Sequence, residues 1–291
     1  MQRSCDTDPP ERVGTGQRGF FGLNRPSSTR VGALALAMCV LIGGTVASAA
    51  VRTSPAAGTT AGVKAARWGP NVKITLSKGS FTFSSNGIPS YGTRPAKYAV
   101  PNAGVIVPGS STAHAAPDPT KAQAYDFTIT TQPAKAVKPT STGLGPIGVM
   151  ISGAVLFNPY EGNGKTVALA SNFTVKDAAG KPVRFLDSCN GHPTPQGQYH
   201  YHGFPSCISA KVDRPGGPSH VLGFAFDGYP IYGDRDVHGK LITAGRLDVC
   251  NGIFSPTPEF PKGIYHYVLL SVPNAHSSIR CLAGKSLSAS G

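Results

Sequence analysis

The alternation of hydrophobic and polar positions becomes regular from residue 71 onward. Val72, Ile74 and Leu76 are separated by polar residues, and this period of two is typical of a half-buried strand. We therefore predict that the regular structure begins here, with a β-rich N-terminal extension over residues 71–140.

Two further short strands are predicted within this extension, over residues 104–107 and 125–130, each bounded by turns rich in proline. Residues 110–119 are polar and lack a regular period, so we expect a loop there.

The second half of the chain contains an internal repeat over residues 141–285. Each copy begins with two glycines five positions apart, continues with Asp-x-Cys-Asn-Gly and Tyr-His-Tyr segments, and closes with a cysteine. Two copies are too few for a solenoid, which needs at least three units. We predict two similar β units packed face to face around a pseudo-twofold axis.

The composition agrees with a mainly β fold. The chain has 36 glycines and 26 prolines, and 40% of its residues are apolar. This combination favours short strands joined by long Gly/Pro-rich loops, because both residues interrupt helices and form turns.

The N-terminal residues resemble an export signal. Five arginines precede an apolar run over residues 31–47, and the small residues Ala47-Ser48-Ala49 follow it. We predict a signal peptide over residues 1–49, with an uncleaved membrane anchor as the alternative. Residues 50–70 are rich in small residues and are predicted to be a flexible linker. The protein is then secreted or anchored in the cell envelope.

The formal charge of +13 comes from dispersed basic residues, without a Lys/Arg run or interleaved aromatic residues. Nucleic acid is therefore not expected as a partner. A dispersed cationic surface suits contact with an anionic cell envelope or a glycan.

Four cysteines follow the leader: Cys189, Cys207, Cys250 and Cys281. In an oxidising compartment they predict two disulfides, for which three pairings are possible. We favour Cys189–Cys207 and Cys250–Cys281, which tie each copy of the repeat to itself, over a crossed pairing.

Three separated motifs resemble the YHYH family. They are Cys-Asn-Gly-His-Pro from Cys189, Tyr-His-Tyr-His-Gly from Tyr199 and Asp-Gly-Tyr-Pro-Ile-Tyr-Gly from Asp227. The resemblance extends over about residues 145–285. It implies a YHYH-like domain, but the family is named for its sequence and implies no reaction.

The Tyr-His-Tyr-His segment predicts a metal site. On a strand, alternate side chains share a face, so His200 and His202 can both reach one ion. His192 can fold back as a third ligand across a proline-rich turn. His266 occupies the position of His200 in the second copy and is expected to face the site. Zn or Cu is the expected ion.

Two other interpretations remain open for these motifs. The histidines can instead form a hydrogen-bonded core ladder with Asp187, Asp248 or Asn190. Alternatively, exposed tyrosines bind a glycan or a protein partner, and the candidates are Tyr199, Tyr201, Tyr229 and Tyr232.

A third possibility is a metal-dependent envelope hydrolase. The stretch from His220 to Asp227 is similar to the H-x-x-G-x-A-x-D pattern of zinc peptidoglycan peptidases, which makes His220 and Asp227 catalytic candidates. The match is partial, since Pro218 stands where that pattern has serine. The chain has no G-x-S-x-G, H-E-x-x-H or phosphate-loop motif.

Overall fold

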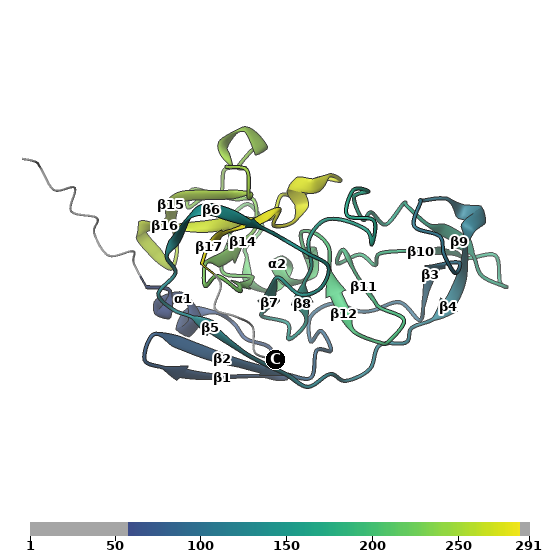
Figure 1. Cartoon of the computed structure of the whole chain (residues 1–291), viewed down its shortest axis with the longest axis horizontal. Coiled ribbons are helices and arrows are strands. Elements are labelled where there is room, and N and C mark those ends of the chain that lie inside the picture. Colours follow the sequence, from purple (N-terminus) through teal and green to yellow (C-terminus); the bar gives the residue numbers. More distant parts are fainter. Residues whose placement is uncertain (1–57, 286–291) are drawn as a thin grey trace, which may run out of the picture. The chain divides into compact units, whose positions relative to one another are not determined.

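The computed structural model describes residues 58–285, and strands account for most of the regular structure in this range (Figure 1). The helices are α1 (Thr60–Ala65) and α2 (Ser206–Val212), with 3-10 turns η1 (Ser110–Thr112), η2 (Ala244–Arg246) and η3 (Ala275–Ser277). The strands are β1 (Val72–Ser77), β2 (Ser80–Ser85), β3 (Lys97–Pro101), β4 (Ala113–Pro117), β5 (Tyr125–Thr130), β6 (Lys135–Ser141), β7 (Gly148–Met150), β8 (Val155–Leu156), β9 (Thr174–Lys176), β10 (Pro182–Arg184), β11 (Gly191–Pro193), β12 (Tyr199–Tyr201), β13 (Gly223–Ala225), β14 (Pro230–Tyr232), β15 (Gly252–Thr257), β16 (Phe260–Val268) and β17 (Cys281–Gly284).

The largest sheet has eight strands in the order β11-β12-β8-β7-β13-β14-β16-β15. Its two four-stranded halves each hold one copy of the repeat. In both halves the inner hairpin is antiparallel, the next pairing is parallel and the edge pairing is antiparallel. Such matching halves require a pseudo-twofold axis between β7 and β13. The predicted mainly β, duplicated fold is confirmed.

The two halves meet where β7 pairs with β13 in antiparallel orientation, with Val149 opposite Phe224. A Cβ at Gly148 would lie 2.7 Å from the carbonyl oxygen of Phe224, and one at Gly223 would collide with the carbonyl oxygen of Val149. Glycine at both positions therefore permits this close pairing. The halves join edge to edge, so our prediction of face-to-face packing is wrong. A continuous sheet satisfies the backbone groups of both inner edges, which stacked units would leave unpaired.

The segments shared by both copies have a structural role. In each copy, one carboxylate oxygen of the aspartate accepts hydrogen bonds from the backbone N–H groups two and four residues later. The other oxygen accepts a hydrogen bond from a tyrosine hydroxyl. The residues are Asp187, Cys189, Gly191 and Tyr199 in the first copy, and Asp248, Cys250, Gly252 and Tyr265 in the second.

The disulfides are Cys189–Cys207 and Cys250–Cys281, as predicted from the repeat. Disulfides of this kind contribute about 2–4 kcal/mol each by restricting the unfolded chain. They also suggest folding in an oxidising environment.

The N-terminal extension forms a second sheet in the order β1-β2-β5, as the alternation at Val72 predicts. Phe81 and Phe83 of β2 are fully buried and belong to one apolar cluster with Phe224 of β13. Trp68 stacks on Phe224 with ring centroids 5.9 Å apart. The extension therefore packs on the duplicated sheet rather than standing apart.

Three local predictions, one in the linker before this extension and two within it, are wrong. The predicted linker includes α1, which is ordered because Val63 is buried in the same cluster as Phe224. Residues 104–107 form no strand, whereas residues 110–119, predicted as a loop, contain η1 and β4. Strand β4 forms because its backbone pairs with β3, a partner that its alanine-rich sequence does not reveal.

Two hairpins flank the first half of the large sheet, β3–β4 and β9–β10. They share an apolar cluster that contains Ala99, Phe173 and Phe185. The hydroxyl of Tyr98 on β3 donates to Asp187, 3.1 Å away, which fastens the β3–β4 hairpin to the first copy of the repeat.

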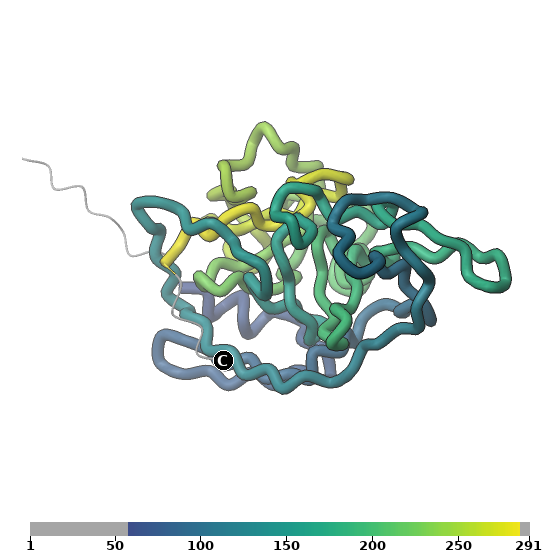
Figure 2. Tube along the Cα trace, turned by 45° about the vertical axis from the view of Figure 1, so that its right-hand side comes forward, coloured from purple at the N-terminus to yellow at the C-terminus, as the bar shows by residue number. Residues whose placement is uncertain are grey.

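At the other end of the chain, β17 pairs with β6, and Figure 2 shows the two strands side by side.

None of the helices between residues 58 and 285 has the length and apolar character needed to cross a membrane. The predicted signal peptide or anchor at residues 1–49, with its apolar run at 31–47, lies outside the described residues.

Candidate metal centre

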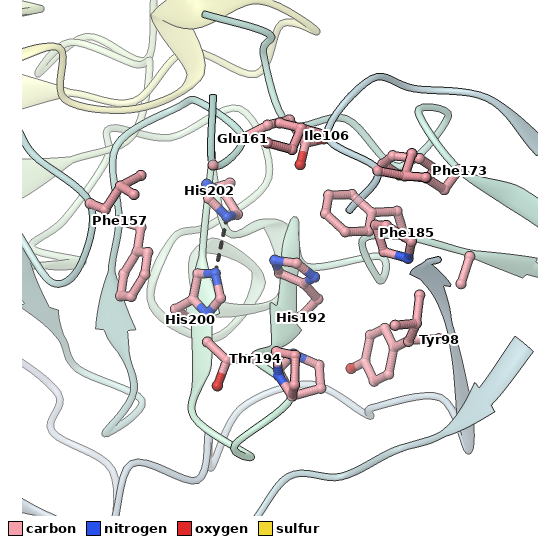
Figure 3. A pocket seen from close by; sticks show the side chains of 18 of the residues that line it. Tyr98, Ile106, Phe157, Glu161, Phe173, Phe185, His192, Thr194, His200 and His202 are labelled. Carbon is pink, nitrogen blue, oxygen red and sulfur yellow. Dashed lines mark hydrogen bonds between the residues drawn. The ribbon is translucent and has the colours of Figure 1, made fainter. Parts of the chain in front are cut away.

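Three histidines of the first copy converge at one edge of the large sheet (Figure 3). His192 on β11 is directly opposite His200 on β12, and His202 follows two positions later on the same face. One ring nitrogen from each lies within 4.8 Å of those of the other two. The predicted grouping of His192, His200 and His202 is confirmed.

Backbone carbonyls orient two of the rings. Nδ1 of His200 lies 3.2 Å from the carbonyl oxygen of Gln198, and Nδ1 of His202 lies 2.8 Å from that of Asn158. A carbonyl oxygen only accepts, so in a neutral ring the proton stays on Nδ1 and the lone pair on Nε2. The two Nε2 atoms lie 3.0 Å apart, which is a hydrogen-bond distance, and when both rings carry their proton on Nδ1 two lone pairs face one another.

The three imidazoles are held in their neutral form. Burial lowers the pKa of His202 to about 4, and it moves the pKa of His200 well below its ordinary value. Burial, reinforced by the neighbouring His200 and His202, also lowers the pKa of His192. Because neutral imidazole is the form that binds a metal, these ligands are available at neutral pH.

A cavity of about 500 Å³ opens beside the three histidines. It is lined by aromatic side chains from separate parts of the chain, among them Tyr98, Phe157, Phe173 and Phe185. Phe157 stacks on His200 with ring centroids 3.9 Å apart, and the ring of Phe185 lies 4.3 Å from that of His192. Aromatic packing thus fixes the ligand rings and forms the cavity walls.

Glu161 is the one acidic residue lining this cavity within the described part of the chain. Its Oε1 accepts from Nδ2 of Asn172 at 2.7 Å, and burial raises its pKa to about 7. The sequence did not identify Glu161 as a site residue. It lies in a loop with no recognisable motif, and only the folding of that loop brings it to the cavity.

The second copy lacks the histidine cluster. The strand registers place Ile253 opposite His266, as His192 is opposite His200, and Val268 takes the position of His202. His266 is buried, its Nδ1 lies 3.0 Å from the carbonyl oxygen of Ile264, and its ring packs on Tyr232. The expectation that His266 faces the site is not met, because it lies on the other half of the sheet.

The four tyrosines proposed for glycan or protein contact are buried. Tyr199, Tyr201, Tyr229 and Tyr232 have exposed fractions of 1%, 0%, 4% and 2%. Three of their hydroxyls are bonded internally: that of Tyr199 to Asp187, that of Tyr201 to Ser152, and that of Tyr232 to Thr257 and Glu259. The prediction of exposed tyrosines is therefore wrong.

The proposed catalytic pair does not assemble into a site. Asp227 is fully buried, and its carboxylate accepts from the hydroxyl of Tyr267 and the backbone N–H of Gly284. His220 instead contacts Asp213 through Nδ1 at 3.2 Å. Within residues 58–285, neither His220 nor Asp227 belongs to a cluster suited to a metal.

The fold and the site define a duplicated β protein with a histidine cluster in one of its two halves. The sequence model of the family described as YHYH protein matches residues 126–241 and 236–284, which is more than half of the chain. The chain belongs to this family, and the match begins earlier than the resemblance suggested, at β5. Neither the curated proteins nor the solved structures contain a match.

Proposed function

We propose that this chain is an exported protein that binds one Zn or Cu ion through His192, His200 and His202. The observation that carries the proposal is the 3.0 Å separation of the Nε2 atoms of His200 and His202, each with its Nδ1 directed at a carbonyl oxygen. When both protons are on Nδ1, the two facing lone pairs repel one another at this distance unless a cation lies against both.

The geometry is close to that of a metal site. Zn–N bonds are about 2.0–2.1 Å long, so two ligand nitrogens at a tetrahedral ion lie about 3.3 Å apart. Small movements of the rings suffice to reach this value from the observed separation. His192 then supplies a third nitrogen from the neighbouring strand.

Three histidine ligands support an ion with an open position. Catalytic zinc sites commonly have three protein ligands and a fourth position for water or substrate, whereas structural sites are closed by four. Here the same histidines line the cavity, so a fourth ligand would come from that side. Imidazole ligands suit both Zn and Cu and do not choose between them.

Comparison of the two copies supports a functional role for the cluster. The segments that both copies share form the Asp and Tyr network, whereas His192 and His202 are replaced by Ile253 and Val268 in the second copy. The second half of the sheet therefore forms without histidines at these two positions. Export is supported by the two disulfides and by the leader-like residues 1–49.

The proposal is tested by measuring bound metal in the full chain, purified with its disulfides intact and dialysed against Zn or Cu. About one equivalent per chain is expected. His192→Ile and His202→Val introduce the residues that the second copy uses at the same strand positions, and each should lower occupancy strongly.

His266→Ala is the matched control, because His266 is the counterpart of His200 and lies outside the cluster. It should keep the full equivalent, with circular dichroism showing that all variants are folded. A wild-type chain without metal, or full occupancy in the His192 and His202 variants, would overturn the proposal.

A further inference from the structure

The cavity beside the histidines has the dimensions of a small-molecule site. Its volume of about 500 Å³ lies within the range of ligand pockets, which is about 300–1,000 Å³. Its wall is completed by residues 98–106, which come from the N-terminal extension. This part of the chain has no counterpart in the second copy, so the cavity is a feature of the first half alone.

The cavity has a polar side and an aromatic side. In Figure 3 the three histidines lie on one side, and Phe173, Phe185 and Tyr98 lie on the other. Phe173 and Phe185 meet edge to face with centroids 5.1 Å apart. A third ring placed among them would add contacts of the same kind, each worth about 0.5–1.5 kcal/mol beyond its buried area.

The charges of the lining disfavour an anion. Among the described residues that line the cavity there is no lysine or arginine, whereas Glu161 contributes a buried carboxyl group. In the metal-free cavity, a carboxylate or phosphate would face Glu161 with no cationic side chain to offset it. A hydroxyl group, by contrast, can donate to that carboxyl group and also present a lone pair to a metal.

We infer that the cavity binds a small neutral aromatic alcohol of the phenol class, with its ring among Tyr98, Phe173 and Phe185 and its hydroxyl oxygen toward the metal. This inference rests on the proposed function for the metal, but the aromatic part of the cavity exists without it. The two parts are therefore separable by experiment.

The test is calorimetric titration of the full chain with 4-methylphenol, with 4-methylcyclohexanol and 4-methylbenzoate as matched probes. The metal-loaded protein should bind 4-methylphenol about tenfold more tightly than 4-methylcyclohexanol, and the metal-free protein should bind it about tenfold more tightly than 4-methylbenzoate. Removal of the metal should weaken this binding about tenfold while leaving measurable affinity.

Ile106→Trp places a larger side chain in the cavity wall, at a residue that is 48% exposed and therefore tolerant of change. It should abolish binding of 4-methylphenol in both the loaded and the metal-free protein. Leu241→Trp is the matched control, since Leu241 is 51% exposed and does not line the cavity, and it should bind as the wild type does.

Four results would each overturn the inference: equal affinity of the metal-free protein for 4-methylphenol and 4-methylbenzoate, equal affinity for the aliphatic alcohol, no binding at all, or binding unaffected by Ile106→Trp. Metal content is measured in the same samples. If the wild type holds no metal, the proposed function fails, and the metal-free titrations still decide whether the cavity selects a phenol.

Discussion

The hydroxyl of Tyr267 donates to the buried carboxylate of Asp227, at the position where the first copy pairs Tyr201 with Ser152. Oδ2 of Asp227 also accepts the N–H of Gly284, 2.9 Å away on β17. Asp227 therefore fastens the last strand to the second half of the sheet. The second copy has aspartate where the first copy has Ser152 because only the aspartate binds both Tyr267 and Gly284.

Asp227→Ser should destabilise the protein without affecting metal content. Serine is too short to accept both groups, and each buried donor left without a partner costs about 1–3 kcal/mol. Chemical denaturation should show a loss larger than that of Ser152→Ala, which removes one buried bond. Loss of metal with unchanged stability would contradict this role.

Asp187→Ala should lower the free energy of unfolding more than Asp248→Ala. Both aspartates accept two backbone N–H groups and one tyrosine hydroxyl, but Asp187 also accepts from Tyr98. The additional bond is worth about 0.5–1.5 kcal/mol. Tyr98→Phe removes this bond alone, so it should lower stability by that amount and speed amide exchange in β3. Equal losses for the two alanine variants would contradict the assignment.

Glu161 should make the metal-free protein less stable as the pH rises. Its pKa is about 7 in the folded chain against about 4.3 in an unfolded one, so between these values only the folded state holds the proton. The contribution of Glu161 to stability therefore falls through this window and is lowest above pH 7. Glu161→Gln removes the effect, so its advantage over the wild type should grow from pH 4 to pH 8. Parallel stability curves would show that Glu161 is not buried as described.

His266 should have the opposite pH dependence. Burial lowers its pKa to about 4, whereas an unfolded histidine titrates near 6.5. Between these values the unfolded state holds the extra proton, so the contribution of His266 to stability rises with pH and is fully present above about 6.5. His266→Leu should reduce the slope of metal-free stability against pH by about 1.4 kcal/mol per pH unit between 4 and 6.5. An unchanged slope would place His266 in a solvated position.

The sequence predicted the duplication, the disulfide pairing and the convergence of His192, His200 and His202, because each depends on order and spacing along the chain. It did not predict how the halves join. β7 and β13 are three-residue strands with every side chain buried, so they have no polar face to show which edge or surface is covered.

The cavity was also beyond prediction from the sequence. Its walls combine residues 98–106, the loop of Glu161 and the ring of Phe185, which are distant in the chain. The tyrosines were misassigned to the surface for a related reason, since their acceptors are known only once the strands have paired. The alternation of residues within a strand predicts which side chains share a face. Contacts between segments distant in the chain can be identified only from the folded structure.

The register at the centre of the large sheet is self-complementary: Gly148 pairs with Ala225, Val149 with Phe224 and Met150 with Gly223. This is the arrangement that two identical strands adopt across a twofold axis. A single-copy ancestor would have built the same sheet as a homodimer, with any ligand site present twice. Fusion of the two copies frees each half to change independently, and a histidine cluster in one half alone is accessible only to the fused chain.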